Sequence, residues 1–465
     1  MKTQSIQLVA LFMFLILGVF FPSQAQNWTL QQCVDTALKN NLSIQQSGNV
    51  TEISKINFNQ SKSDLLPSLS GGIGQSYDLE NSSNSNISLS GSVTLFNGFQ
   101  NKNTIKQNQL DYQASKYDME AQKNNIVLNV VDAYLKVLYA EELVKNAKAQ
   151  VDAIQLQFNE IEQFVIVGKK SESDLLQVKS ELASEKLTYI NAEGQLKSAK
   201  LNLQQIMNIP ISKTFDIEYP LSIEPKTEGL SKADDIYNLA LTQQPVIKSY
   251  ELKTQSSEYG LKIAKGAIYP RLSLGGNLGT NYLSSMKISE TTYLNNIQNI
   301  GYLQSNPNEI VMGNVSAPVY NYFDYAFDKQ LKDNFSKSLS LSLSIPIYSN
   351  RQVKNNIKKQ EITLKNTLLD EQSVKNDLRK EIEQASIDVE NAIAKYGATK
   401  EQVSSSMASY ENAKAKYENG MMNMSELIHE LNSFTKAQSE NIQARYELIY
   451  NLKILDYYKG IPLIF

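Results

Sequence analysis

Four segments of the chain alternate between apolar and small polar residues, the pattern of a β-strand whose two faces differ. We expect strands over residues 66–77, 86–96, 270–282 and 338–348. One face of the last strand carries leucines such as Leu341, and the other carries serines such as Ser342. A sheet in a soluble domain would expose Lys and Glu on its polar face, so this pattern favours a membrane strand with a lipid side and a wet side. In the first two strands the apolar face is expected to comprise Leu69, Ile73, Tyr77, Ile87, Leu89, Val93 and Leu95.

Long helical patterns follow each pair of strands. Residues 99–167 contain neither Gly nor Pro, and residues 351–419 contain no Pro and a single Gly. Between residues 143 and 165 the apolar positions alternate by three and four, which is typical of packed helices. After Gly168 and Gly420 the chain is expected to return as shorter helices, so each pattern predicts a long helical hairpin.

The same order of parts occurs twice. Pro67 and Pro270 lie in similar strands 203 residues apart, whereas Gly168 and Gly420 lie in similar turns 252 residues apart. The sequence Asn-Ile-Pro at 208–210 matches Gly-Ile-Pro at 460–462, again at an offset of 252. The duplication predicts two structural repeats, residues 26–229 and 230–465, with a linker at 208–229. The additional residues of the second repeat predict a long, Asn- and Tyr-rich solvent loop at 283–337.

The first 25 residues have the character of a secretory signal peptide. Lys2 precedes an unbroken apolar run, Leu8–Phe21, and Ser23-Gln24-Ala25 provides a small-x-small cleavage pattern. A transmembrane anchor is the alternative, but the run is shorter than the roughly 20 residues that a spanning helix needs. We therefore expect cleavage after Ala25 and export from the cytoplasm.

Composition excludes several classes of function. The formal net charge of −3 gives no reason to expect nucleic-acid binding. The chain has one His and one Cys, which excludes most metal sites and most nucleophilic triads, and no glycine-rich phosphate loop follows a strand. We therefore expect no enzyme activity, no cofactor and no metal.

The number of strands points to an assembly. Four strands cannot close a membrane barrel, since about eight is the smallest number known, and an open strand edge cannot lie in lipid. The missing strands must come from other copies of the chain. Three copies would supply twelve.

Several motifs together resemble the TolC-like outer membrane efflux protein family over essentially the whole chain after residue 25. They are the opening Trp28-Thr29-Leu30 with Ala37–Asn41, and the glycine turns followed by Asp174-Leu175-Leu176 and Glu426-Leu427-Ile428. The resemblance implies a mainly α protomer built from duplicated helical and β-hairpins. It also implies a homotrimeric, 12-stranded β-barrel in the outer membrane that continues into a periplasmic α-helical tunnel.

The family resemblance further implies a function and partners. The chain would be the outer-membrane channel of a tripartite efflux or type I secretion system. It would work with a periplasmic adaptor (membrane fusion) protein and an inner-membrane transporter, and its cargo would be a drug, a metal, another small molecule or a protein. A periplasmic coiled-coil adaptor or scaffold is the alternative. Such a protein would share the helical hairpins but would need neither the strands nor detergent.

The resemblance also implies roles for single residues. Gly168 and Gly420 would form the periplasmic tip, Tyr417 would hydrogen-bond Asp174 across it, and Glu426 and His429 would ring the closed entrance. The family's additional arginine tether is not carried over, because Met422 stands at its position.

Purely structural roles remain open for the same residues. Ser171-x-x-Asp174 and Asn423-x-x-Glu426 both fit helix-capping boxes. The glycines fit turn positions with positive φ, and His429 fits an exposed helix position.

Overall fold

The computed structural model describes residues 27–79, 82–219, 225, 231–461 and 463. The expected signal peptide, residues 1–25, lies outside the described residues. Eight of the helices within the described residues form four pairs of equal length, in which the second member is offset from the first by 203 or 252 residues. They are α2 (Leu30–Asn40) and α6 (Ala233–Gln243), α3 (Leu42–Ser63) and α7 (Pro245–Gly266), α4 (Gln100–Ile166) and α9 (Gln352–Glu418), and α5 (Glu172–Ile206) and α10 (Met424–Tyr458). The duplicated helical hairpins expected from the sequence are therefore present.

The two repeats are not the two compact units of the chain. One unit comprises the chain up to Lys55, Leu110–Gln255 and the chain from Lys365 onwards, and the other comprises Ile56–Gln109 and Ser256–Leu364. The first unit is helical, and the second holds the strands with the adjoining ends of four helices. Each unit therefore combines material from both halves of the sequence.

The strand-bearing unit contains an open antiparallel sheet in the order β1-β2-β3-β6. Its strands are β1 (Ser68–Tyr77), β2 (Ser83–Asn97), β3 (Arg271–Leu283) and β6 (Ser336–Ser344). Directly opposite residues in an antiparallel ladder project from the same face. Apolar residues lie opposite apolar residues, as in Leu274 opposite Leu341, and serines lie opposite serines, as in Ser273 opposite Ser342. The sheet therefore has one largely apolar face, which is interrupted where Gln75 lies opposite Ser85, and one face of Ser, Gly and Asn.

Two details of the expected strands were wrong. The ladder between β2 and β3 is irregular between Thr94 and Phe96, so Phe96, and not Leu95, lies opposite Leu272. A bulge adds one residue to a strand and thereby reverses the alternation beyond it. The last strand ends at Ser344 and not at residue 348, because its partner β3 begins at Arg271, opposite Ser344.

The expected solvent loop at 283–337 is largely a second, two-stranded sheet. Strands β4 (Lys287–Leu303) and β5 (Asn306–Asp324) pair along their length, and α8 (Phe327–Asp333) follows them. The fully buried Gln330 donates hydrogen bonds to the carbonyl oxygens of Leu283 and Tyr325 and accepts one from the Leu283 amide. This single side chain joins the two ends of the β4–β5 ribbon.

A large apolar core in the helical unit lies around the middle of α4. It includes Val130, Val131 and Leu138, and it also takes in Phe215 and Ile217 from the linker. Trp28 forms a parallel bridge with Ile217, and the Tyr134 hydroxyl donates to the Glu218 carbonyl at 2.7 Å. The described part of the linker is thus fixed against the first repeat.

No helix within the described ranges combines the length and the hydropathy that crossing a lipid bilayer requires.

Candidate functional site at the turn end of the helical hairpins

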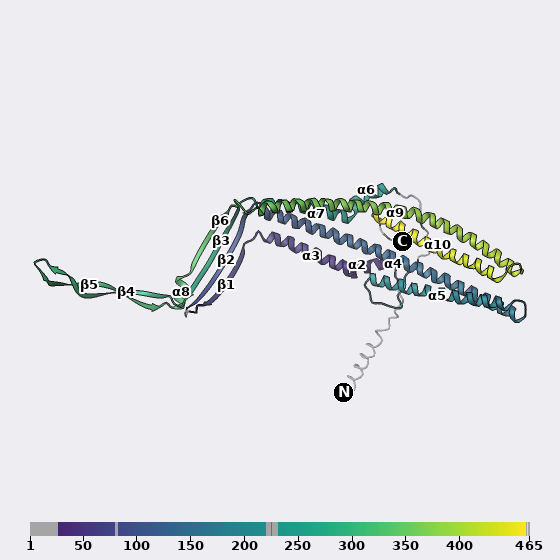
Figure 1. Ribbon diagram of the computed structural model, residues 1–465, viewed down its shortest axis with the longest axis horizontal. Coiled ribbons are helices and arrows are strands. Elements are labelled where there is room, and N and C mark those ends of the chain that lie inside the picture. Colours follow the sequence, from purple (N-terminus) through teal and green to yellow (C-terminus); the bar gives the residue numbers. More distant parts are fainter. Residues whose placement is uncertain (1–26, 80–81, 220–224, 226–230, 462, 464–465) are drawn as a thin grey trace, which may run out of the picture. The chain divides into compact units, whose positions relative to one another are not determined.

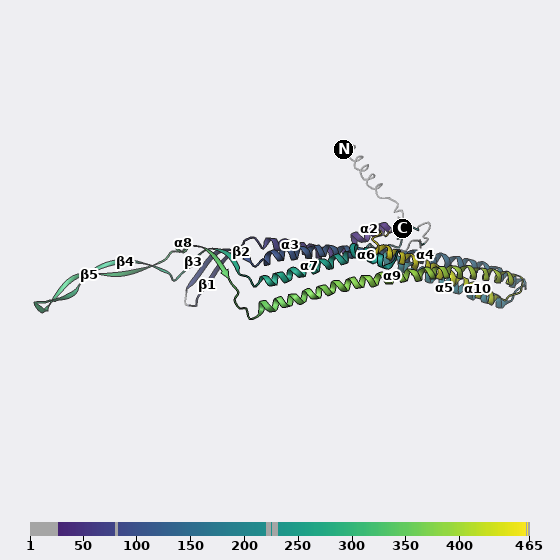
Figure 2. The same ribbon diagram turned by 90° about the horizontal axis from the view of Figure 1, so that it is seen from above.

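The turns of the two helical hairpins lie at the same end of the helical unit (Figures 1 and 2). Four helices are joined there by one apolar cluster. Its buried members are Ile154 and Ile161 of α4, Val178 and Leu182 of α5, Ala413 and Tyr417 of α9, and Met424, Leu427 and Leu431 of α10. The two hairpins are therefore held together directly behind their turns by burial of apolar side chains.

Both turns are built in the same way. Gly168 has a φ of 73° and Gly420 a φ of 71°. The amides of Gly168 and Lys169 donate to the carbonyls of Val165 and Phe164, and the amides of Gly420 and Met421 repeat this pattern with Tyr417 and Lys416. These bonds form the Schellman motif, which ends a helix with a residue in the left-handed conformation. An added Cβ at either position would meet nothing within 4 Å, so space does not require glycine there. Glycine is favoured because it adopts positive φ without strain.

The helices that leave the two turns are capped differently. Ser171 accepts from the Asp174 amide at 3.1 Å, and the Asp174 carboxylate accepts from the Ser171 amide at 3.3 Å, which completes a capping box. At the second turn, Asn423 accepts from the Glu426 amide at 2.9 Å. The Glu426 carboxylate makes no return bond to the cap backbone. The capping role is thus fully realised for Asp174 but only half realised for Glu426.

The structure places Tyr417 close to Asp174 without the hydrogen bond expected between them. Tyr417 is 8 % exposed, and its hydroxyl oxygen is buried with no hydrogen-bond partner. Burial, together with the nearby carboxylates of Asp174 and Glu160, raises the pKa of Tyr417 to about 12. The phenol is therefore a neutral donor without an acceptor in this conformation.

Lys170 is a site residue that the sequence patterns did not identify. Its ammonium nitrogen lies 3.8 Å from the centroid of the Tyr417 ring. A cation over an aromatic face is attracted by the ring quadrupole. Lys170 lies in the loop between α4 and α5, and Tyr417 lies at the C-terminal end of α9. The contact therefore links the two hairpins, whereas the expected hydrogen bond is absent. No spacing motif signals such a pair, because its partners are 247 residues apart.

The expected entrance residues Glu426 and His429 are both exposed on α10. They lie three residues apart, so they occupy neighbouring positions on one side of the helix. Neither contributes to the apolar cluster. Within the described residues, no group of three or more His, Cys, Asp or Glu side chains could hold a metal ion.

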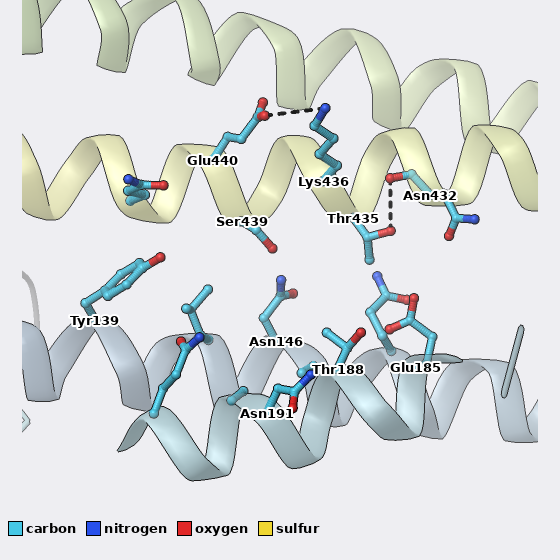
Figure 3. Close-up of a pocket in the computed structure, with 16 residues that line it drawn as sticks. Tyr139, Asn146, Glu185, Thr188, Asn191, Asn432, Thr435, Lys436, Ser439 and Glu440 are labelled. Carbon is cyan, nitrogen blue, oxygen red and sulfur yellow. Dashed lines mark hydrogen bonds and ion pairs between the residues drawn. The ribbon is translucent and has the colours of Figure 1, made fainter. Parts of the chain in front are cut away.

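A polar cavity of about 460 Å³ separates the hairpins further from the turns. Figure 3 shows Asn146, Glu185, Thr188 and Asn191 facing Asn432, Thr435 and Ser439 across it. Amide and hydroxyl groups dominate this lining, in contrast to the apolar cluster at the turns. The contact between the hairpins is therefore apolar next to the turns and mainly polar further from them.

Two carboxyl groups belong to this polar region. Burial raises the pKa of Glu181, against the opposing effect of a hydrogen bond with Asn432. Burial also raises the pKa of Glu185, and the charge of Glu181 adds to that effect. One pattern in the sequence could have predicted this polar region. Polar residues recur at four-residue spacing in α5, next to its buried Val178 and Leu182: Gln177, Glu181 and Glu185.

The family profile described as "Outer membrane efflux protein" matches residues 33–208 and 236–457. This chain belongs to the outer membrane efflux protein family. The resemblance inferred from the sequence is thereby confirmed, as are the fold class and a location in the outer membrane with a periplasmic extension. Membership in this family of efflux proteins favours a channel over a periplasmic adaptor or scaffold.

Two curated relatives are similar to this chain in sequence. Outer membrane protein TolC of Salmonella enteritidis is 22 % identical over 94 % of this chain and 82 % of its own length. Toxin and drug export protein A of Aggregatibacter actinomycetemcomitans is 22 % identical over 57 % of this chain and 58 % of its own length, so the match covers less than two thirds of that relative.

A solved structure shares the fold of the whole protomer. The Campylobacter jejuni CmeC outer membrane channel superposes with a TM-score of 0.74 at 18 % identity, covering 93 % of this chain and 85 % of that one. The shared fold extends over both compact units, because neither unit alone could account for such coverage.

Proposed function

We propose that this chain forms the outer-membrane channel of a tripartite efflux or type I secretion system, and that it works as a homotrimer. The observation that carries the proposal is the open four-stranded sheet with one apolar and one serine face. Three such sheets, joined edge to edge, would make a twelve-stranded barrel with its apolar face toward lipid and its serine face toward water. No edge would then be left unpaired in the membrane.

The helical hairpins would continue the channel into the periplasm. Their turns, marked by Gly168 and Gly420, would form the tip at which a periplasmic adaptor docks and the inner-membrane transporter delivers its cargo. Glu426 and His429, exposed beside the second turn, would line the entrance. The closed tip would be held by the apolar cluster and the Lys170–Tyr417 contact, since Asp174 is engaged in its cap.

The names of two relatives indicate classes of cargo for the channel. One is named for export of toxin and drug, and another, from Pseudomonas aeruginosa, for export of pyoverdine. The inner-membrane transporter would select the cargo.

The β4–β5 ribbon would lie outside the cell, because it connects two barrel strands at the end away from the helices. An epitope inserted between Gln304 and Ser305, in the turn of the ribbon, should bind antibody on intact cells. Binding that appears only after rupture of the outer membrane would place the ribbon on the wrong side.

The direct test of the function is electrical. The purified protein, added to planar lipid bilayers, should produce discrete single-channel currents. Glu426→Gln should weaken block of these currents by divalent cations, because a ring of carboxylates at the entrance would be neutralised. A correctly folded, membrane-inserted protein that never conducts, even after deletion of the tip turns, would refute the channel.

A further inference from the structure

The free edge of β6 ends beside an uncovered apolar socket. The socket has a volume of about 370 Å³ and lies between the end of α7 and the start of α9. Its apolar lining is Ala267, Ile268, Pro346, Ile347, Tyr348, Val353 and Ile357. Ile347 is 95 % exposed and Tyr348 79 % exposed, which is far more than large apolar side chains usually show.

The first repeat contains the same place in a less exposed form: Leu95 and Phe96, which correspond to Ile347 and Tyr348 at the offset of 252, are 53 % and 36 % exposed. Two consecutive residues with positive φ join β2 to α4, Gly98 and Phe99, and two such residues, Asn350 and Arg351, precede α9 at an offset of 252. In the first repeat, residues 266–272 run alongside this junction. An added Cβ on Gly98 would lie 2.2 Å from the Gly266 carbonyl oxygen, and Phe96 lies opposite Leu272.

The repeat identifies what would cover the socket of the second half. The covering segment 266–272 corresponds, at the offset of 203, to residues 63–69. That segment is already at the outer edge of the sheet within its own chain, and it carries the exposed apolar residues Leu66 and Leu69. It therefore has an apolar surface that matches the socket and has no cover of its own.

We infer that residues 63–69 of a second copy of this chain fill the socket, and that β6 pairs with β1 of that copy in the register that β2 adopts with β3. The inference rests on the proposed homotrimer and gives it residue-level contacts. Transferring the observed β2–β3 pairs by the two offsets places Ser340 opposite Ser76, Leu343 opposite Ile73, and Leu339 opposite Tyr77 of the neighbouring copy.

The transferred register also places like residues opposite each other at most positions, although only the two offsets were used to obtain it. It joins Ser340 to Ser76, Leu343 to Ile73 and Leu339 to Tyr77. Leu341 lies opposite Gln75, so the apolar face continues across the boundary between copies with one polar interruption. A slip of one residue would bring every leucine onto the serine face. The pairing also explains the different ends of the two strands. β2 continues to Asn97, which corresponds to residue 349, whereas β6 ends at Ser344. Residues 345–349 have no partner strand within their own chain.

Asn350 marks one place where the two junctions differ. Gly98 is approached so closely that no side chain would fit, whereas Asn350 carries a Cβ. The backbone of the neighbouring copy must therefore lie farther from Asn350 than Gly266 lies from Gly98.

Cysteine crosslinking tests the register. Directly opposite residues have Cβ atoms about 4.5–5.5 Å apart, so Ser76→Cys combined with Ser340→Cys should form a disulfide between copies under mild oxidation. Ser76→Cys combined with Ser336→Cys or with Ser344→Cys gives matched controls, displaced by four residues, or about 13 Å, in either direction. Single variants control for Cys33, which is buried.

The expected result is a ladder of linked chains, lost on reduction, for Ser76 with Ser340 alone. Stronger linkage in either control pair, from a protein that still has the mass of a trimer, would overturn the register and leave the proposed function intact. A protein with the mass of a monomer and no linkage in any pair would overturn the trimer itself.

A second pair of variants tests the socket. Leu66→Asn should leave the helical content of the chain unchanged, because Leu66 is already 67 % exposed, but it should lower the fraction assembled. Leu187→Asn, on α5, is the matched control, since Leu187 is 58 % exposed and lies far from the socket in sequence. Equal assembly of the two variants would contradict the filling of the socket by Leu66.

Discussion

Tyr417 and Asp174 lie close enough for the carboxylate to raise the pKa of the phenol, yet they share no hydrogen bond. The carboxylate instead accepts from the Ser171 amide at the start of α5. The phenol stays buried beneath Lys170. What joins the two hairpins at their turns is therefore apolar packing and a cation over a ring.

This arrangement makes Tyr417→Phe a discriminating substitution. Removing a buried hydroxyl that has no partner should leave the free energy of unfolding unchanged or raise it by up to about 1 kcal/mol, whereas losing a hydrogen bond to a charged group would cost about 1.5–3 kcal/mol. Thermal unfolding of the helices, followed by circular dichroism, measures the difference. Clear destabilisation by Tyr417→Phe, with an increase in channel conductance, would restore the Tyr417–Asp174 bond as the gate tether.

The two turn glycines should tolerate substitution worse than glycines within helices. Gly168→Ala and Gly420→Ala should each destabilise the protein by about 1–2 kcal/mol, because a residue with a Cβ is strained at positive φ. No clash with neighbouring atoms adds to this cost. Gly194→Ala and Gly397→Ala are controls within α5 and α9, where a Cβ also meets nothing, and they should stabilise by about 0.5–1 kcal/mol. The same sign at all four positions, in thermal unfolding, would contradict the backbone argument.

The polar region between the hairpins predicts a dependence on pH. Burial raises the pKa of Glu185 in the folded protein above its unfolded value, so the folded state binds the proton more tightly. Stability should then be greatest below the unfolded value, near 4.5, and should fall as the pH rises through the higher folded value.

Glu185→Gln should reduce that pH dependence. At neutral pH this variant should unfold at a higher temperature than the parent, and the advantage should vanish as the pH approaches 4.5. Glu181, which raises the pKa of Glu185, and Lys436 and Glu440, which line the same cavity, would remain. Glu411→Gln, an exposed change on α9, is the control and should show no such trend.

The parts of this fold that repeat were predictable from the sequence, and the parts that do not repeat were largely missed. The spacing of Gly168 and Gly420 predicted both turns, because a left-handed residue after a long helix has few chemical solutions. The β4–β5 ribbon was missed because its residues lack clean alternation. Asn, Ser and Thr are interspersed with Tyr and Val, and this composition is equally typical of loops.

Contacts between distant segments were the hardest to predict. The sequence offered both a cap and a tether for Asp174, and only the distance to Ser171 decides in favour of the cap. Lys170 over Tyr417 could not be predicted, since it depends on the relative placement of two hairpins. The bulge near Leu95 was equally hidden, because one extra residue leaves the surrounding alternation plausible in either register.

The two faces of β6 allow a paired test of the barrel. Leu341→Arg should impair assembly by about 2–4 kcal/mol if it lies near the bilayer midplane, because it would place a charge in lipid. Ser342→Arg, on the next residue and the opposite face, should be tolerated and should alter the conductance. Indistinguishable effects of the two substitutions on assembly in lipid would refute the assignment of the faces.

The central claim is that the open sheet of one chain is completed only by other chains. The most direct measurement is the mass of the protein after extraction from outer membranes in a mild detergent. The account predicts a stable complex of three chains that needs detergent to stay in solution. A folded, stable monomer, or a protein that remains in solution without detergent, would contradict it.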